Sequence, residues 1–350
     1  LTQGPLVDEF EERVAGYVGV PYAVAFSSGT AALHGAMYAA GVESGDVVLT
    51  SPLTFAATAN SVLYVKGVPV FLDIDPKTYC LDPERVAQFC RRKNPKAIAP
   101  VSYAGYPVDM KAFRSLADSC GAVLVEDACH ALGAERNGVK VGLEADMTVL
   151  SFHPVKHVTT GEGGMVLTKS TEFAEKLRLF RSHGITKDPA MMARNPEGPW
   201  YTEMLELGYN YRLSDIQCAL GISQMKRLDA SIARRREIAA RYDNAFRGND
   251  AIAIPPGHPG HAYHLYPVWI SPELRKRVFE GLRDAGIGVQ VHYLPVPLHP
   301  YYRRVFGYKP GGFPNAEKIY SGEISLPMYP DLDDADVSRV IHEVLLLVGA

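Results

Sequence analysis

Between about residues 22 and 168, short apolar runs alternate with segments of helical periodicity. The runs AVAF, DVVLT and VPVFLDI are each followed by a helical pattern, and AVLVED, MTVLSF and MVLT complete the set. In MKAFRSLAD the apolar residues Met110, Phe113, Leu116 and Ala117 fall at helical spacing. Almost continuously apolar strands that alternate with helices are typical of a mostly parallel sheet with helices on both faces. We therefore expect an α/β fold.

The rest of the chain has a different pattern, with a long helical segment and many proline-rich loops. Residues 213 to 247 predict a long helical segment, broken near Gly221, that connects two domains. Proline-rich loops follow, with strand candidates HLYPVWI and GVQVHY, a helix PELRKRVFEGLRDAG and a closing helix DADVSRVIHEVLLLV. We expect a large domain over residues 1–230 that includes an N-terminal arm, and a smaller α+β domain over residues 231–350.

Composition excludes several classes of function. The formal charge of -3 shows no excess of positive charge of the kind that binds a nucleic acid. No apolar run approaches the roughly 18 residues that a membrane span requires. The five cysteines are scattered and contain no C-x-x-C pair, so neither a disulfide framework nor a zinc knuckle is indicated. Small-molecule chemistry in the cytoplasm is the remaining expectation.

Polar residues follow the apolar runs, at the strand ends where parallel sheets collect ligands. In SSGTAALHGAM, Gly29 is free to adopt unusual dihedrals and Thr30 is placed to cap the next helix. The exposed amides of such a helix start can bind a phosphate. An ordinary Ser/Thr helix cap explains the same residues.

The segment VEDACH places Asp127 directly after an apolar strand and His130 three residues later. A carboxylate in this position can pair with a cationic ring nitrogen or bind a metal. Taken alone, the segment favours a simpler role for Asp127, as the cap of a following helix.

The segment SFHPVKHVTTGEGG carries Lys156 out of another strand. A lysine there is either a solvated surface charge or a partly desolvated amine able to form a Schiff base. His153 and His157 have the i, i+4 spacing of a helical metal site. However, Pro154 argues against a helix and no H-E-x-x-H carboxylate joins them, so we expect no metal.

A phosphate cradle, a carboxylate for a ring nitrogen and a Schiff-base lysine, each at a strand end, together match the needs of pyridoxal 5'-phosphate (PLP). The sequence has no G-x-G-x-x-G and no G-K-[ST] motif, so dinucleotide binding and phosphoryl transfer lack their usual signatures.

Longer motifs carry a family resemblance: SSGTAAL, TFAATAN, VEDACHALGA, SFHPVKHVTTGEGGM, GYNYRLSDIQCALG and VQVHYLPV. Over essentially its whole length the chain resembles the DegT/DnrJ/EryC1/StrS sugar aminotransferases, which are fold type I PLP enzymes. The resemblance implies a homodimer with shared active sites. It also implies transamination, because related dehydratases carry histidine where this chain has Lys156.

The resemblance further implies roles for individual residues. Lys156 would bind the cofactor aldehyde and Asp127 would pair with the pyridine nitrogen. The other implied contacts are Gly29, Thr30 and Ser151 with the phosphate, Asn210 reaching in from the partner subunit, Phe55 stacked on the ring, His130 beside the pyridine, Arg212 at the donor carboxylate, and His183, His292 and Tyr293 at the sugar or nucleotide. From pattern alone, Phe55 is better explained as a core aromatic on an amphipathic helix. Asn210 also fits a simple turn residue.

Within the family, the motifs most resemble the branch that serves pseudaminic acid biosynthesis. The expected reaction moves the amino group of L-glutamate to C4 of a UDP-linked 4-keto-6-deoxy-N-acetylhexosamine. The alternatives are C4 or C3 amination of another UDP, dTDP or GDP keto sugar, or a PLP-fold binding or regulatory protein without turnover.

Overall fold

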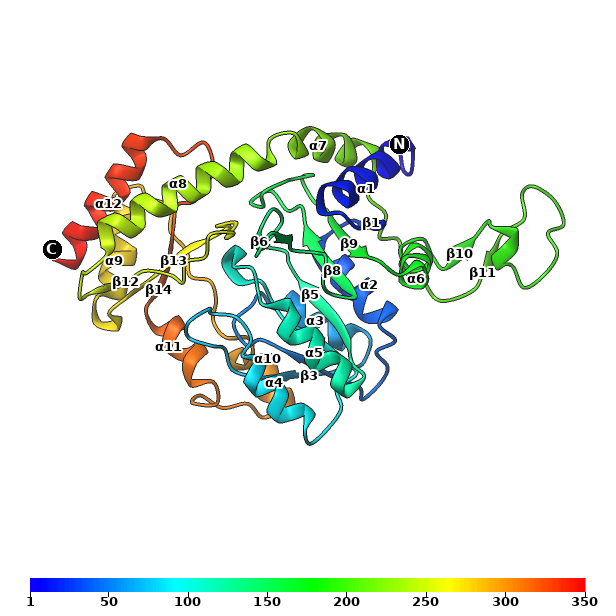
Figure 1. Cartoon of the computed structure of the whole chain (residues 1–350), viewed down its shortest axis with the longest axis horizontal. Helices are drawn as coiled ribbons and strands as arrows, with labels where there is room; N and C mark the ends of the chain where they lie inside the picture. Colours follow the sequence, from blue (N-terminus) through cyan, green and yellow to red (C-terminus); the bar gives the residue numbers. More distant parts are fainter. Residues whose placement is uncertain (350) are drawn as a thin grey trace.

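The computed structural model describes residues 1–349 and is built around a seven-stranded sheet in the order β1-β9-β8-β5-β4-β2-β3 (Figure 1). Its strands are β1 (Tyr22–Phe26), β2 (Val47–Thr50), β3 (Val68–Phe71), β4 (Ala97–Ala99), β5 (Val123–Asp127), β8 (Met147–Ser151) and β9 (Gly164–Thr168). Only β9 runs antiparallel to its neighbours, so the other six strands point in one direction. The expected α/β fold with a mostly parallel sheet is confirmed.

Helices cover both faces of this sheet. They are α1 (Pro5–Val18), α2 (Gly29–Ala39), α3 (Ala57–Tyr64), α4 (Pro83–Cys90), α5 (Met110–Cys120), α6 (Thr171–Arg181) and α7 (Asp215–Met225). In β1, Val24 and Phe26 pack with α2 and α6, whereas Ala23 and Ala25 pack with α1. Because alternate side chains enter two different cores, β1 is apolar at consecutive positions instead of at every second one.

The expected long helix is two helices, α7 and α8 (Leu228–Phe246), and the break lies at residues 226–227 rather than near Gly221. Gly221 serves close packing instead: a Cβ there would lie 2.6 Å from the ring of Phe10. Helix α8 begins in the core that contains α1 and ends in the core of the smaller part, so it joins the two (Figure 1).

The smaller part contains a three-stranded antiparallel sheet of β12 (Ile252–Ala253), β13 (Tyr266–Ile270) and β14 (Glu323–Leu326). Helices α8, α9 (Pro272–Asp284) and α12 (Asp334–Val348) share its core. The predicted strand GVQVHY is wrong: its only pairing is an isolated bridge between Gln290 and Ser325. The following residues leave the sheet for the large core, where the amide of Val296 donates to the carbonyl of Pro52 at 2.9 Å.

Helices α10 (Pro300–Phe306) and α11 (Pro314–Gly322) also pack on the large core, although they lie late in the sequence. The division into residues 1–230 and 231–350 stays a prediction. Buried residues between 296 and 319 in the second segment belong to a core of the first. This return of the chain brings residues from both parts to one place.

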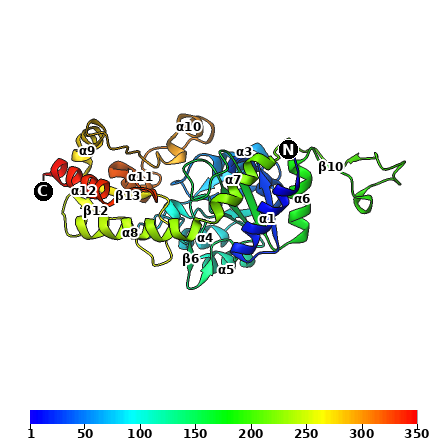
Figure 2. The ribbon, with the colours of Figure 1, turned by 90° about the horizontal axis from the view of Figure 1, so that it is seen from above.

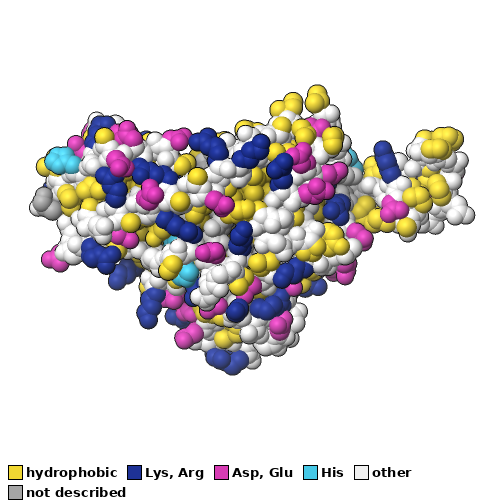
Figure 3. Space-filling view, turned by 45° about the horizontal axis from the view of Figure 1, so that its top comes forward, with side chains coloured by type: hydrophobic (Ala, Val, Ile, Leu, Met, Phe, Trp, Pro, Cys, Tyr) yellow, Lys and Arg dark blue, Asp and Glu magenta, His cyan; other side chains and the backbone are white. Residues whose placement is uncertain are grey.

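A slender arm projects from the large part (Figures 1 and 2). It starts with the two-stranded pair of β10 (Ile185–Thr186) and β11 (Glu203–Met204). Hydrophobic side chains gather on it in Figure 3, and Trp200, Met204 and Leu207 are exposed. The remaining short elements are the β6–β7 pair (Glu135–Arg136 and Val139–Lys140) and three turns of 3-10 helix (Tyr103–Gly105, Pro189–Met191 and Val296–Leu298). Among residues 1–349, no helix has the length and apolarity to span a membrane.

Candidate active site

A cavity of about 330 Å³ lies at the carboxyl ends of the central strands. Nine of the residues singled out by sequence line it: Gly29, Thr30, Phe55, Asp127, His130, Ser151, Lys156, His292 and Tyr293. They come from segments that span most of the chain. The rule that parallel sheets gather ligands at their carboxyl ends therefore locates this cavity correctly.

Lys156 lies in the loop between β8 and β9 and is partly buried. Its Nζ is 3.2 Å from Nε2 of His264. Burial lowers the pKa of Lys156 to about 8, and the nearby Cys129 and Asp127 oppose this shift only in part. A substantial fraction of the amine is thus neutral near physiological pH, which is the form that attacks a carbonyl. The alternative of a fully solvated surface lysine is wrong.

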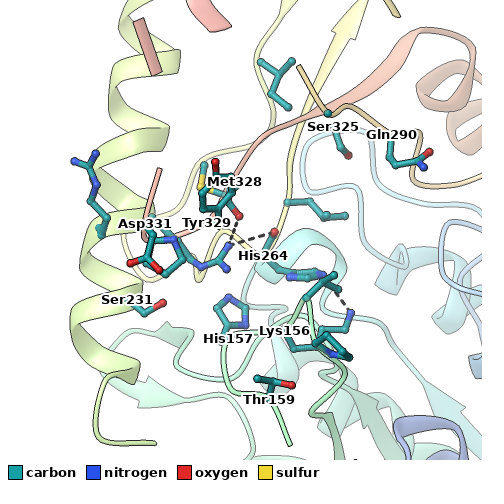
Figure 4. A pocket seen from close by; sticks show the side chains of 18 of the residues that line it. Lys156, His157, Thr159, Ser231, His264, Gln290, Ser325, Met328, Tyr329 and Asp331 are labelled. Atoms are coloured by element: carbon teal, nitrogen blue, oxygen red, sulfur yellow. Dashed lines mark hydrogen bonds between the residues drawn. The ribbon is translucent and has the colours of Figure 1, made fainter. Parts of the chain in front are cut away.

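A second cavity, of about 920 Å³, is also lined by this lysine, and Figure 4 shows Lys156 among the residues around it. Lys156, His292 and Tyr293 line both cavities. The far wall of the larger cavity comes from α8, which contributes Ser231 and Arg235. Lys156 therefore stands at the junction of a small cavity and a large one.

Asp127 is the last residue of β5 and is 5% exposed. Thr58 Oγ1 donates to one of its carboxylate oxygens at 2.6 Å, and the amide of Cys129 donates to the other at 3.1 Å. No helix begins after it, so the helix-cap interpretation is wrong. Both donors are neutral, which leaves a buried carboxylate facing the cavity without a compensating cation from these contacts.

The start of α2 forms an anion site. Ser28, not Thr30 as expected, is the capping residue, and its hydroxyl accepts from the amide of Ala31 at 3.1 Å. The leading amides of a helix have no partner within it and attract negative charge. Here they abut Ser151: a Cβ on Gly29 would lie 3.0 Å from Ser151 Cβ and Oγ. Only glycine leaves the helix start this close to the serine hydroxyl.

The histidines near Lys156 are held neutral. Burial lowers the pKa values of His130, His157 and His264 well below the usual range. The amide of Ala104 donates to Nδ1 of His130 at 3.3 Å, so its Nε2 carries the proton toward the hydroxyl of Tyr293, 3.4 Å away. His157 Nε2 lies 3.0 Å from the carbonyl oxygen of Ala262, to which it donates. It therefore has a structural partner.

No helix contains His153 and His157, so the i, i+4 spacing has no geometric consequence. His153 is exposed and its Nε2 is 3.9 Å from a carboxylate oxygen of Glu162. Within residues 1–349 no group of three or more His, Cys, Asp or Glu side chains is arranged to hold a metal ion.

Three predicted site residues, His183, Asn210 and Arg212, line neither cavity. They lie near the base of the arm, where the amide of His183 donates to the carbonyl of Tyr209 and Ser182 pairs with Asn210. Their roles stay predictions. Phe55 is 59% exposed and its ring centroid is 6.0 Å from that of Tyr293, so the core-aromatic alternative is wrong.

Sequence reasoning missed two residues at the junction, His264 and Arg235. His264 precedes β13 and nothing near it in the sequence indicates a lysine partner. Arg235 belongs to an RRRE run that reads as a solvated helix face, yet it is 3% exposed. Its Nη1 donates to the carbonyls of Tyr263 and Met328 at 3.0 and 2.7 Å, and burial lowers its pKa to about 10.

Comparison with known proteins agrees with this geometry. A model of the DegT/DnrJ/EryC1/StrS aminotransferase family matches residues 1–345. The UDP-4-amino-4,6-dideoxy-N-acetyl-beta-L-altrosamine transaminase of Campylobacter jejuni is 41% identical over 347 residues, which span 97% of this chain and 89% of that protein.

Solved structures agree as well. Helicobacter pylori PseC, an aminotransferase involved in the biosynthesis of pseudoaminic acid, has a TM-score of 0.91 at 34% identity, covering 100% of this chain and 92% of that one. NtdA of Bacillus subtilis, solved with bound cofactor PMP, has a TM-score of 0.87 at 28% identity, covering 100% and 78%.

The residues of the smaller cavity fit PLP, the cofactor of this family. The start of α2 with Ser151 offers an anion site, Asp127 offers a buried carboxylate bound only by neutral donors, and Lys156 offers an amine of lowered pKa. These are the three groups that the phosphate, the ring nitrogen and the aldehyde of PLP need. The chain belongs to the DegT/DnrJ/EryC1/StrS aminotransferase family and is a PLP-dependent nucleotide-sugar aminotransferase of fold type I.

Proposed function

We propose that this enzyme moves the amino group of L-glutamate to C4 of a UDP-linked 4-keto-6-deoxy-N-acetylhexosamine, in a pathway of the pseudaminic acid type. The observation that carries the proposal is the position of Lys156 between two cavities of different size. The smaller matches a cofactor, and the larger has room for a nucleotide sugar. The names of the Campylobacter and Helicobacter relatives support this choice of sugar.

The residues of the chain divide the work. PLP, when bound, supplies an aldehyde for amines and a ring that withdraws electrons. Lys156 anchors it and, once released, moves protons as a neutral amine, which its lowered pKa favours. Asp127 keeps the ring nitrogen protonated. In the larger cavity Lys226, Arg227 and Arg235 provide positive charge for a diphosphate.

We further propose a homodimer with shared active sites, working in the cytoplasm. Asn210 and Arg212 lie at the base of the arm and outside the cavities of their own chain, and the arm exposes Trp200 and Met204. These features suit residues that complete the site of a second copy. All five cysteines are free, as expected in a reducing compartment.

The test is to incubate the protein with PLP, L-glutamate and a panel of UDP, dTDP and GDP keto sugars, and to identify products by NMR. We expect a 4-amino product from the UDP-linked 4-keto sugar. Preferred amination of a dTDP or GDP sugar, or amination at C3, would replace the proposed substrate by one of the alternatives. A visible absorption band that glutamate fails to shift would instead indicate a binding protein without turnover.

A further inference from the structure

Strand β14 separates apolar from polar side chains. Ile324 and Leu326 enter the core of the smaller part, and Glu323 and Ser325 therefore point to the opposite face. Glu323 is 1% exposed. Its two carboxyl oxygens contact neutral groups: Ser325 Oγ at 2.5 Å and the amide of His292 at 2.7 Å. A buried carboxyl group in such a place requires an explanation.

The contacts continue as a chain. Ser325 Oγ also lies 2.9 Å from Nδ1 of His292. A serine hydroxyl has one proton, so it can donate to only one of these two neighbours and must accept from the other. When Glu323 is ionised, Ser325 donates to it and Nδ1–H of His292 donates to Ser325. When Glu323 carries a proton on the oxygen facing Ser325, both hydrogen bonds reverse and the proton of His292 sits on Nε2.

The other ring nitrogen of His292 faces the cavities. His292 lines both the small and the large cavity. Within residues 1–349, Nε2 of His292 makes no hydrogen bond. It is also not one of the fully enclosed polar atoms that lack a partner, so part of its surface is accessible. This atom is thus open to a ligand at the junction where Lys156 stands.

We propose that Glu323 and Ser325 are positioning residues that set the tautomer of His292. His292 Nε2 then accepts a hydrogen bond from a sugar hydroxyl when Glu323 is ionised, and donates one to a carbonyl oxygen when Glu323 is protonated. The identity of the ligand rests on the proposed function, whereas the coupling between the three residues does not. No net charge moves onto the imidazole in either state.

Glu323 and His292 have pKa values that allow this change of tautomer. Burial raises the pKa of Glu323 to about 8 and lowers the pKa of His292 to about 4. Between pH 6 and 10 the imidazole therefore stays neutral and Glu323 changes state. The other groups that face this pair are Arg275, which lowers the pKa of Glu323, the tyrosines Tyr79, Tyr103 and Tyr293, whose pKa values burial raises, and Lys156 and His130 near His292.

Lys156 titrates in the same range as Glu323, so the discriminating variant is Glu323→Gln. Its amide stays neutral at every pH, can accept from the His292 amide and can donate to Ser325. Ser325→Ala removes the link, and Ser325→Thr retains a hydroxyl as the matched control. None of these substitutions removes the Lys156 amine, so its titration is common to all the variants.

The tautomer of His292 is read from long-range ¹H–¹⁵N NMR spectra of protein labelled with ¹⁵N-histidine, with assignment from the signal that His292→Gln removes. We expect the proton on Nε2 at pH 6 and on Nδ1 at pH 10 in the unmodified chain and in Ser325→Thr. In Glu323→Gln it should remain on Nε2 throughout, and Ser325→Ala should lose the switch. One tautomer at both pH values in the unmodified chain, or an unchanged switch in Glu323→Gln, would overturn the proposal.

Enzyme kinetics test whether His292 contacts the sugar, independently of the coupling between Glu323, Ser325 and His292. With a sugar that is accepted, Glu323→Gln should remove the part of the pH dependence of kcat/KM near pH 8 that the sugar profile does not share with the glutamate profile, and should leave the glutamate profile unchanged. Equal changes in both profiles would overturn the role at the sugar. If no keto sugar is turned over, the proposed function fails, and the NMR result still decides the coupling.

Discussion

The two walls of the cofactor cavity are built differently. In the wall from the large sheet, two key contacts join residues close in sequence, the Cys129 amide with Asp127 and the Ala31 amide with Ser28, beside the longer-range hydrogen bond of Thr58 to Asp127. In the facing wall, contacts join distant segments: Ser325 with His292 lies 33 residues apart, and His264 with Lys156 lies 108 apart. The first wall is recognisable as short motifs. The second exists only after the chain has returned to the sheet.

The difference suggests a division of roles. Local turns at strand ends are rigid and suit a cofactor whose phosphate, ring nitrogen and aldehyde need fixed partners. Long-range contacts from the smaller part can vary with less effect on the sheet, which suits recognition of the sugar. Variants of the first wall should therefore alter cofactor binding and chemistry, and variants of the second should alter sugar kinetics alone.

The largest effect is expected for Lys156, which belongs to both cavities. Lys156→Ala should lower transamination by roughly 10³-fold, because it removes the amine that we propose anchors the cofactor and moves the proton. Far-UV circular dichroism should be unchanged. Lys309→Ala, at an exposed lysine, is the control. A near-normal rate for Lys156→Ala would contradict the assignment of the site.

Asp127→Asn tests the first wall. The amide keeps the shape but loses the charge, so we expect a rate lower by roughly 10²-fold with weak PLP binding retained. Asparagine has a single acceptor oxygen, so only one of the two present donors, the Thr58 hydroxyl or the Cys129 amide, keeps its hydrogen bond to residue 127. The measurement is the rate of the absorbance change on adding glutamate to the PLP-loaded variant. Normal transamination would show that Asp127 is structural.

Glu126 precedes Asp127 but is fully buried and accepts from Ser102 at 2.7 Å. Burial raises its pKa to about 7. A raised folded-state pKa stabilises the fold below the unfolded value near 4.5, and this contribution is lost as the pH rises through about 7. Between pH 5 and pH 8, Glu126 therefore lowers the free energy of unfolding by about 2 kcal/mol.

Glu126→Gln should remove this loss of unfolding free energy between pH 5 and pH 8. Urea unfolding at both pH values measures it. Glu175→Gln, at an exposed position, should retain it. An identical loss of stability with pH in Glu126→Gln and the unmodified chain would show that Glu126 does not titrate in this range. Cofactor chemistry should be little affected, in contrast with Asp127→Asn.

Gly29→Ala tests the packing of the anion site. The added Cβ would lie 3.0 Å from Ser151 Cβ and Oγ, so the helix start must move away from the serine. We expect PLP affinity to fall about tenfold, or about 1.4 kcal/mol, by fluorescence titration. Gly16→Ala in α1, where a Cβ meets nothing within 4 Å, is the matched control and should bind PLP normally. Equal affinities for both variants would argue against a phosphate at this helix start.

The smallest effect is expected in the facing wall. Tyr293→Phe removes the hydroxyl that lies 3.4 Å from Nε2 of His130 and retains the ring. A hydrogen bond this long is weak, so kcat/KM for the sugar should fall only about twofold, with PLP affinity unchanged. A marked loss of PLP would show that the two walls do not divide their roles in this way.

The motifs of the large sheet made much of the site predictable. Asp127 and Ser151 end strands, and Gly29 follows a third strand end, so the rule for parallel sheets places them together before any contact is known. The errors were Thr30 in place of Ser28 as the cap, a helix break at Gly221 and a strand at GVQVHY. Packing settled the last two, because Gly221 lies against Phe10 and the residues after GVQVHY leave the sheet for the large core.

The sequence by itself determined the alternation of strands and helices and the cofactor, and it singled out Lys156 as the residue proposed to anchor that cofactor, because periodicity and strand-end motifs are local signals. Only the tertiary structure decided that Lys156 is desolvated beside His264, that Arg235 is buried, and that Glu323 connects through Ser325 to His292. Burial and the juxtaposition of distant segments set pKa values and hydrogen-bond directions, and neither is encoded in the spacing of residues along the chain.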